Sequence, residues 1–528
     1  MTLPIGLVSR SEMKERSMYK FTFNLFMIAF FIGCTAENIV IDPVKTEKSK
    51  AVILTTTNKR VFLVNNQTNL TTSEITNSEE LKISISPSTL PPGLSFSEIT
   101  GVMSGVSTGT YPETTYTITG INESRKVENK ITLSSHEGFH VNTNRNANDA
   151  NLGDGKCETA TPGECTITAA IMESAVQNTT KFILLEEETY VLTMPFTLTY
   201  SSANITLQGR GMGKTIITSN QSPTSKFVLT AGAVTVNDVT FNEFGRASAS
   251  IDNFFRLQNS ASLSINDSVI QNSITTNGAI IKASNNSTLD LDNVFLYNNR
   301  SENSGIIFIE GDAVVNIDGV VWYKNDGHQG GCAEIQIHSN TTINNSICFD
   351  NHTRHLDKSA LNVGTCGCPT DLDIKNTVIS NNTHAVSGSI AGFLIGRITS
   401  STAARVVMSN LIISDNTDSA LADKNCFIRP SGGTVTDHGH NLLSGSDCSG
   451  GRFTGANNLF STDPLFSSTV FTIDPYKIPS LDISTSSPII DAGNTSFCST
   501  KDQLGNSRPV DFNGTGLLCD IGPIEAQI

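Results

Sequence analysis

The sequence predicts an all-β protein in which a small β-sandwich precedes a three-sided parallel β-helix with a cap at each end. Apolar residues make up 38% of the 528 residues and charged residues only 16%, while Asn, Ser, Thr and Gly fill the difference. These residue types favour turns and half-exposed strands over helices. In addition, one short phrase recurs seven times between Ile205 and Ile413, and a repeat of this length indicates a solenoid.

Each phrase holds an apolar-x-apolar strand, a turn residue and a second apolar strand, as in Leu263-Ser-Ile-Asn-Asp267-Ser-Val-Ile270. The turn residue is always Asp, Asn or Gly, the types that tolerate the left-handed backbone of a tight corner. It stands at Asp238, Asp267, Asn293, Gly319, Asn345, Asn376 and Asn410. The successive spacings are therefore 29, 26, 26, 26, 31 and 34 residues.

An asparagine stands six residues after the turn residue in five of the seven phrases, and we expect these asparagines to hydrogen-bond along the stack. They are Asn299, Asn325, Asn351, Asn382 and Asn416. A third apolar run follows in several coils, at 278–282, 305–309, 332–337 and 360–363, so a coil of about 26 residues holds three short strands. This pattern resembles that of pectate-lyase-type β-helices, and the resemblance implies a right-handed helix. Two inserts, 351–369 and 384–405, are expected to be loops that leave one corner.

Residues 1–34 have the pattern of an export signal. Lys14, Arg16 and Lys20 precede an apolar run at 21–32 that is too short to cross a bilayer comfortably as a helix. The end of this segment resembles the lipobox of bacterial lipoproteins, because a small residue, Gly33, precedes Cys34. The resemblance implies a lipid on Cys34 and a tether at 35–50. An ordinary cleaved signal peptide is the alternative. Translation starts at Met1, Met13 or Met18.

The eleven cysteines indicate an oxidising compartment. Cys34 stands apart, and an odd total with one outlier predicts ten paired thiols. The ten candidates are Cys157, Cys165, Cys332, Cys348, Cys366, Cys368, Cys426, Cys448, Cys498 and Cys519. Three close pairs, 157/165, 426/448 and 498/519, are expected to form disulfide bonds that close loops. Cys332 and Cys348 either form a disulfide or only pack in the core. Finger-type zinc spacing is absent.

Residues 51–137 form the first folded unit. Strand candidates lie at 51–54, 81–85, 114–119 and 130–133, so a small β-sandwich is expected. The phrase Leu90-Pro-Pro-Gly-Leu-Ser-Phe96, the turn at 100–105 and the tyrosines at 111 and 116 resemble the immunoglobulin-like repeats of bacterial surface proteins. The resemblance implies a spacer, with binding of carbohydrate or protein as the alternative.

Residues 138–200 are expected to form the N-terminal cap and the first strands of the β-helix. The Gly-Asp-Gly turn before Cys157 and the run around Cys165 resemble the CSLREA-type opening of exported bacterial β-helices, although Thr168 and Ala169 replace the usual Arg and Glu. We expect a helix at 166–175 that caps the open end of the stack, because a terminal coil otherwise exposes unpaired strand edges. Asp149 and Asp154 are candidate Ca²⁺ ligands, with bracing of the turns as the alternative.

The coils occupy 201–433, and residues 434–528 form the C-terminal cap. The series Thr436–Leu443, Asp463–Phe466, Leu481–Gly493 and Asp502–Pro509, ending in Ile524-Glu525, resembles the ending called choice-of-anchor Q in exported β-helix proteins. Pro523 replaces a more usual Ala. Four charged residues of this region lie among Gly and Pro, and we interpret them as groups that brace turns. They are Asp491, Asp502, Arg508 and Asp520.

The candidate catalytic residues are expected mainly on the inserted loops. One group is Asp350, His352, Arg354, His355 and Asp357, and a second is Asp437, His438 and His440. A lyase needs carboxylates that hold Ca²⁺ and an Arg or Lys base, and a hydrolase needs paired carboxylates. No family-specific catalytic phrase is present, and histidines on loops are usually only solvated.

The sequence therefore predicts an exported lipoprotein that joins the membrane through Cys34, at the outer membrane or cell surface rather than facing the periplasm. The net charge of −15 disfavours nucleic acid as a partner. The expected function is a binding, adhesion or structural module, with glycans or surface proteins as partners and no cofactor apart from the Ca²⁺ alternative. A polysaccharide lyase or glycoside hydrolase on the same scaffold is the rival hypothesis.

Overall fold

The computed structural model describes most of the chain after residue 51. The described residues are 52–54, 59–65, 74–76, 82–122, 125–177, 181–192, 204–219, 226–245, 252–364, 369–396, 404–428, 433–445, 448, 453–468, 471, 473–512, 514 and 516–527. The predicted export signal, the tether and Cys34 lie outside these residues, as do Cys366 and Cys368. Within the described ranges, no helix is both long and apolar enough to span a membrane.

The first unit is a small β-domain with one mixed sheet in the order β2-β8-β7-β4. These strands are β2 (Lys59–Leu63), β4 (Lys82–Ser86), β7 (Tyr111–Asn122) and β8 (Arg125–His136). Two antiparallel pairs accompany it, β1 (Val52–Leu54) with β3 (Glu74–Thr76) and β5 (Leu94–Phe96) with β6 (Met103–Gly105). The four predicted strands are confirmed, and the immunoglobulin-like assignment stays a prediction.

The predicted capping helix is confirmed as α1 (Ile167–Gln177). Thr166 precedes it and accepts a hydrogen bond from the amide of Ala169 (3.0 Å), as an N-cap residue does. Ile167 and Ile171 lie in the same apolar core as the first coils, so α1 covers the end of that core. Before the helix, β9 (Gly138–His140) pairs with the first strand of the stack.

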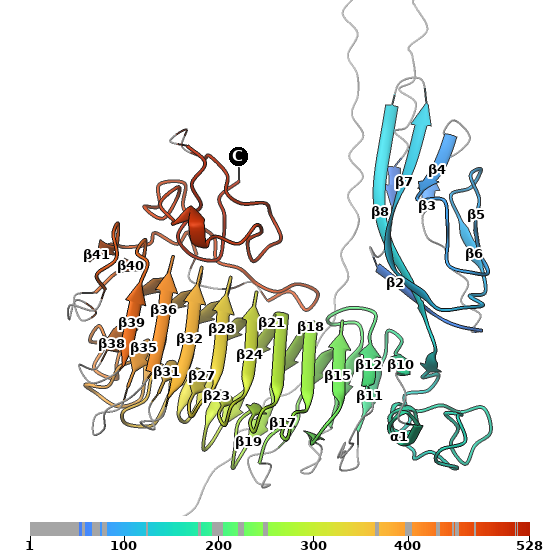
Figure 1. Ribbon diagram of the computed structural model, residues 1–528, viewed down its shortest axis with the longest axis horizontal. Coiled ribbons are helices and arrows are strands. Elements are labelled where there is room, and N and C mark those ends of the chain that lie inside the picture. Colours follow the sequence, from blue (N-terminus) through green and yellow to red (C-terminus); the bar gives the residue numbers. More distant parts are fainter. Residues whose placement is uncertain are drawn as a thin grey trace, which may run out of the picture. The chain divides into compact units, whose positions relative to one another are not determined.

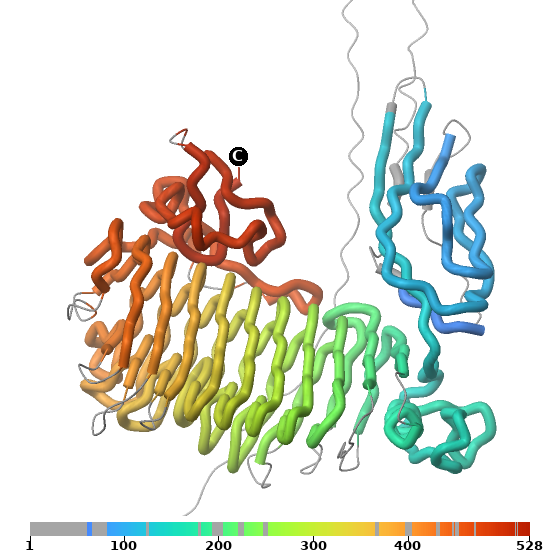
Figure 2. The backbone as a smooth tube through the Cα atoms, in the orientation of Figure 1, coloured from blue at the N-terminus to red at the C-terminus, as the bar shows by residue number. Residues whose placement is uncertain are grey.

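The rest of the chain is a parallel β-helix with three long ladders of strands, and Figures 1 and 2 show its coils stacked side by side. The first ladder is β10 (Lys181–Leu184), β12 (Asn204–Gln208), β15 (Ala233–Asn237), β18 (Ser262–Gln271), β21 (Thr288–Tyr297), β24 (Val314–Asp318), β28 (Asn340–Asn344), β32 (Thr370–Lys375), β36 (Ala404–Ser409) and β39 (Thr434–Asp437).

The second ladder follows the corner that each turn residue makes, and β18 and β21 run through that corner into it. Its other strands are β11 (Thr189–Val191), β13 (Ile216–Thr218), β16 (Thr240–Asn242), β25 (Val321–Tyr323), β29 (Ile347–Phe349), β33 (Val378–Ser380), β37 (Ile412–Ser414), β40 (Leu442–Leu443) and β41 (Leu459–Phe460).

The third ladder is β14 (Phe227–Leu229), β17 (Phe255–Leu257), β20 (Ile281–Ala283), β23 (Gly305–Ile309), β27 (Gly330–Ile335), β31 (Leu361–Val363), β35 (Phe393–Ile395) and β38 (Cys426–Ile428). A short ladder of two-residue strands lies between the second and the third. It consists of β19 (Ile274–Thr275), β22 (Arg300–Ser301), β26 (Asp326–Gly327), β30 (His352–Thr353) and β34 (Thr383–His384).

The register confirms the predicted spacing of the repeat. Leu263 pairs with Leu289 and Leu289 with Val315, each 26 residues further along the chain. The seven turn residues all have a left-handed backbone, with φ between 45° and 64°. The five predicted asparagines are buried, and each is bonded to a neighbouring coil, as where Asn325 N donates to Asn351 Oδ1 at 2.9 Å and Asn416 Nδ2 donates to the carbonyl oxygen of Ile379 at 2.9 Å.

Within the described residues, four disulfides clip the coils and the caps, all between the predicted cysteines. They join Cys157 to Cys165, Cys332 to Cys348, Cys426 to Cys448 and Cys498 to Cys519. The second pair lies inside the β-helix core, so its members pair rather than only pack.

The inserts are less loop-like than predicted. Residues 352–353 form β30 in the first insert, and residues 393–395 form β35 in the second. The prediction of plain loops is wrong at these positions because the inserts still carry apolar residues, such as Phe393, that complete the third ladder.

Beyond β41 the chain is mostly irregular, with one 3-10 turn, η3 (Thr495–Phe497). The centre of this C-terminal segment is the buried ion pair between Arg508 Nε and Glu525 Oε2 (3.0 Å). Arg508 also donates to the carbonyl oxygens of Asp520 and Gly522, while the carboxylate of Asp520 accepts from the amides of Asp491 and Ala526. These groups brace turns, as the sequence predicts, and burial raises the pKa of Asp520 to about 7.

Candidate functional site

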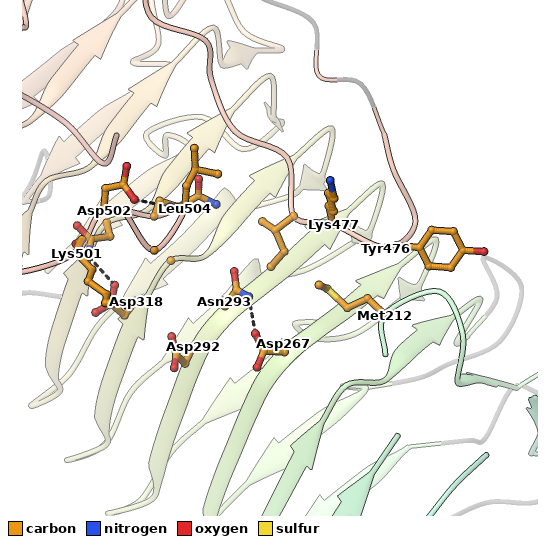
Figure 3. Close-up of a pocket in the computed structure, with 15 residues that line it drawn as sticks. Met212, Asp267, Asp292, Asn293, Asp318, Tyr476, Lys477, Lys501, Asp502 and Leu504 are labelled. Atoms are coloured by element: carbon orange, nitrogen blue, oxygen red, sulfur yellow. Dashed lines mark hydrogen bonds between the residues drawn. The ribbon is translucent and has the colours of Figure 1, made fainter. Parts of the chain in front are cut away.

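A cavity of about 510 Å³ lies between the turn-residue corner of four coils and two stretches of the C-terminal segment (Figure 3). It is lined by Met212, Asp267, Asp292, Asn293, Asp318, Gly319, Asn345, Tyr476, Lys477, Ile478, Lys501, Asp502, Gln503, Leu504 and Gly505. A concave site with apolar walls and a few converging polar groups is the usual form of a ligand site.

The floor of the cavity is acidic. Asp292 lies within β21 directly before its corner, Asp318 ends β24, and the two are direct register partners in neighbouring coils. Asp267 follows at the corner and accepts a hydrogen bond from Asn293 Nδ2 (2.5 Å). Asp318 accepts from Asn344 and Asn345, whereas the Asp292 carboxylate accepts no hydrogen bond from the described residues. Asp292 is therefore the floor carboxylate with the most open hydrogen-bonding capacity.

The surroundings raise the pKa of two floor carboxyls. Burial raises the pKa of Asp292, and the negative charges of Asp318 and Asp267 raise it further. Burial also raises the pKa of Asp318, against the lowering effect of its bonds to Asn344 and Asn345. Both side chains line the cavity and are exposed, so they are accessible to solvent and to a ligand. Both carboxyls can thus accept hydrogen bonds from a ligand in the cavity.

The roof consists of Tyr476 to Ile478 and Lys501 to Gly505. Asn345 Nδ2 donates to the carbonyl oxygen of Lys501 (3.3 Å), which holds the second stretch against the coils. The carboxylate of Asp502 is occupied by the amides of Leu504, Asn506 and Glu525, so it shapes the turn instead of facing a ligand. Tyr476 stands at one end of the cavity, with 57% of its surface exposed.

The predicted cluster on the first insert lies on the short ladder and shares no residue with the cavity lining. Arg354 Nη1 donates to Glu302 Oε2 (2.7 Å), and Arg354 Nε lies 2.8 Å from Asp326 Oδ1. The structure thus brings Arg354 together with two carboxylates that the sequence did not single out. Because Arg354 also donates to the carbonyl oxygen of Ser301, its guanidinium is committed to ion pairs and bonds.

The other members of that cluster are spread around Arg354. His352 Nδ1 lies 2.9 Å from Thr383 Oγ1, and the His355 ring packs edge-on against His328 at 5.0 Å. Asp350 occupies the next corner of its coil, where burial raises its pKa against the effect of Lys324. Asp357 takes a left-handed turn conformation. A catalytic role for this cluster stays a prediction.

The second predicted group braces the C-terminal end of the helix. Asp437 accepts four hydrogen bonds, from the amides of Gly439 and Gly455 and from the side chains of Asn441 and Asn458. His438 stacks on Phe497, and His440 Nδ1 contacts the carbonyl oxygen of Ala492 (2.7 Å).

The candidate Ca²⁺ ligands are bonded to backbone amides. Asp149 accepts from Asn151 and Glu158, and Asp154 accepts from Lys156. Across the described ranges, no group of three or more His, Cys, Asp or Glu side chains is placed to hold a metal ion. The bonds of both residues are those of the turn-bracing alternative.

Sequence reasoning missed the cavity residues, although a signal for its floor was present. The residue before the turn residue is Asn237, Asn266, Asp292, Asp318 and Asn344 in successive phrases, so carboxylates occupy one outward row in two consecutive coils. Tyr476, Lys477 and Lys501 carried no comparable signal, because they lie on irregular chain far from that row in sequence.

Fold and cavity together define a class, a disulfide-clipped parallel β-helix protein whose irregular C-terminal segment covers part of one corner. No protein-family model matches the chain, and no curated protein matches it. Among solved structures, the crystal structure of pectate lyase Pel9A is similar, with a TM-score of 0.36 and 13% identity, over 74% of this chain and 96% of that chain. A likeness at that level assigns no activity.

Proposed function

We propose that this protein is an exported, membrane-anchored β-helix lipoprotein that binds carbohydrate in the cavity under its C-terminal segment. The observation that carries the proposal is the lining of the cavity. Carboxylates and amides on the floor can accept and donate bonds to hydroxyl groups, and Met212, Ile478 and Tyr476 offer apolar surface to a sugar face. Four disulfides support export, because such bonds persist in oxidising compartments.

Binding is tested with a panel of immobilised and soluble polysaccharides. Tyr476→Ala removes an exposed ring at one end of the cavity and is expected to weaken binding about three- to tenfold, the usual worth of an aromatic contact. Leu517→Ala is the matched control, since Leu517 is 68% exposed on the same C-terminal segment and lies outside the cavity lining. If no polysaccharide binds the wild-type protein, the proposal fails.

Anchoring is tested separately by detergent phase separation of the cell envelope. The lipobox-like Gly33-Cys34 predicts that the wild-type protein enters the detergent phase and that Cys34→Ala leaves it in the aqueous phase. Equal partitioning of both proteins into the aqueous phase would contradict the anchor.

A second candidate function is glycoside hydrolysis, and one observation favours it. Asp292 and Asp318 are register partners on adjacent strands, whose backbones lie roughly 4.8 Å apart, and both have a raised pKa. Retaining glycosidases use two carboxyls separated by about 5 Å, of which one is a protonated acid. Release of reducing ends from a bound polysaccharide, lost in both Asp292→Asn and Asp318→Asn, would establish hydrolysis; binding without release would exclude it.

A further inference from the structure

Three of the seven turn residues in the corner row already bind a polymer, which is the protein's own irregular C-terminal segment. Asn345 Nδ2 donates to the carbonyl oxygen of Lys501 (3.3 Å) and Asn376 Nδ2 to that of Phe497 (3.1 Å). Asn410 Nδ2 donates to the carbonyl oxygen of Asn494 (3.2 Å). Three consecutive coils therefore each hold one acceptor of a chain that crosses the stack.

Towards the earlier coils the same row continues along the cavity. After Lys501 the segment folds into a turn, in which the Asp502 carboxylate accepts hydrogen bonds from the amides of Leu504 and Asn506, and this turn forms part of the roof of the cavity. The row positions that follow are Gly319, Asn293 and Asp267, and all three line the cavity (Figure 3). A second polymer can thus lie across these coils in continuation of the path that the C-terminal segment takes over the later ones.

The negative charges on the floor of the cavity favour non-acidic over acidic polysaccharides as ligands. Asp267, Asp292 and Asp318 form the floor, and a carboxylate accepts hydrogen bonds but donates none when ionised. A polyuronate would bring its own carboxylates against this floor, where like charges in a crowded site repel strongly. Lys477 and Lys501 in the roof offset part of that repulsion, but the chain as a whole carries −15. Hydroxyl or amino groups, in contrast, supply the donors that the floor lacks.

We infer that the cavity holds a non-acidic polysaccharide, neutral or amino-substituted, which lies across the coils of Asp267, Asn293 and Gly319 and donates hydrogen bonds to Asp292 and Asp318. This inference rests on the proposed carbohydrate-binding function and specifies its substrate class. It also separates this protein from binders of acidic plant or bacterial polysaccharides.

Gly319→Asn is the sharpest variant for the test. Gly319 has φ +64°, and a Cβ there would meet Asn293 N and Cα at 3.4 and 3.5 Å, which is ordinary contact. The corner positions on either side carry Asn with φ 55° and 45°, so an asparagine fits the backbone and extends the row into the cavity. Gly388→Asn is the control, because Gly388 also has a positive φ, has no atom within 4 Å of its Cβ position and lies outside the lining.

Asp292→Asn tests the acceptor role of the floor, with Asp290→Asn as its control. Asp290 lies two residues earlier on β21, faces the same side of the strand and bonds Asn316 Nδ2 (2.7 Å) outside the cavity. Unchanged thermal midpoints and circular dichroism show that each variant is folded.

The experiment measures the affinity of the full-length protein and these variants for three soluble polymers, a neutral glucan, chitosan and polygalacturonate. We predict binding of the glucan or chitosan and no binding of polygalacturonate. Gly319→Asn is expected to weaken that binding about tenfold because its side chain fills part of the cavity, and Asp292→Asn by a similar factor because a floor acceptor of one or two hydrogen bonds is lost; the controls should weaken it less than about twofold.

Each of the other outcomes overturns one part of the proposal: the substrate class, the binding site or the carbohydrate-binding function. Binding of polygalacturonate that Gly319→Asn abolishes overturns the non-acidic substrate class and leaves the carbohydrate function in place. Binding of any polymer that neither variant weakens overturns the cavity as the site. If none of the polymers binds, the proposed function itself fails.

Discussion

At the scale of single residues, side-chain identity decides the backbone at the first corner of each coil. Asp, Asn and Gly tolerate a left-handed conformation, and all seven predicted positions adopt it. The second corner, five residues after the first, is also left-handed in all seven coils, and Asn or Asp occupies it in five of them, at Asn272, Asn298, Asp350, Asn381 and Asp415. Lys324 and Glu243 occupy it in the other two coils, and because lysine and glutamate have no preference for this conformation, the corner could not be predicted from residue type at those two positions.

A residue-scale prediction concerns Glu186 at the start of the helix. A hydrogen bond from His140 (2.7 Å) and the guanidinium of Arg210 (2.9 Å) lower its pKa to about 2. Because the folded-state pKa is below the ordinary 4.5, the stabilisation is present above about pH 4.5 and is lost as the pH falls towards 2. The side chain is 38% exposed, so solvent screening limits the effect to about 1 kcal/mol.

Chemical denaturation of Glu186→Gln checks this prediction. The variant is expected to be less stable than the wild type by about 1 kcal/mol at pH 6, and the difference should vanish near pH 2. Glu188→Gln, an exposed neighbour, should change stability by less than about 0.5 kcal/mol at either pH. A difference that grew on acidification would contradict a lowered pKa of Glu186 in the folded protein.

At the scale of elements, the buried asparagine ladder holds neighbouring coils together. Asn351 Nδ2 donates to the carbonyl oxygens of Trp322 and Phe349 (3.0 Å each), and its Oδ1 accepts from the amide of Asn325 (2.9 Å). Since this corner is buried, removing the amide leaves several backbone groups without partners.

We therefore expect Asn351→Ala to destabilise the stack by about 2–4 kcal/mol, seen as a lower urea midpoint. The matched control is Asn340→Ala, because Asn340 is exposed at the start of β28 in the same coil and should cost less than about 0.5 kcal/mol. Equal midpoints for the two variants would show that the ladder is not a stabilising element.

The elements themselves were largely predictable because their signals are local. The period of apolar residues predicted the register, and close spacing of cysteines predicted three of the four disulfides. The pairing of Cys332 with Cys348 was left open, because an inward-facing thiol can equally well only pack. Strand β35 was missed because Phe393, Leu394 and Ile395 lie inside an insert whose length hides the repeat.

At the scale of the whole molecule, the cavity could not be predicted from the sequence. It exists because the C-terminal segment folds back on coils far away, as where Asn344 bonds Ser499 over a separation of 155 residues. No periodic pattern relates two such segments, and the irregular chain around Lys477 and Lys501 has no repeat of its own. The acidic residues in two consecutive phrases indicated the floor of the cavity, whereas the roof was found only in the structure.

Whether a polysaccharide lies in this cavity is tested most directly by hydrogen–deuterium exchange of the full-length protein with and without a bound non-acidic polysaccharide. We predict slower exchange of the amides at 476–478 and 501–505, the two stretches of the roof, with the short ladder around Arg354 unchanged. Slower exchange confined to the residues around His352 and Arg354, with the roof unchanged, would place the polysaccharide elsewhere and refute the cavity as its binding site.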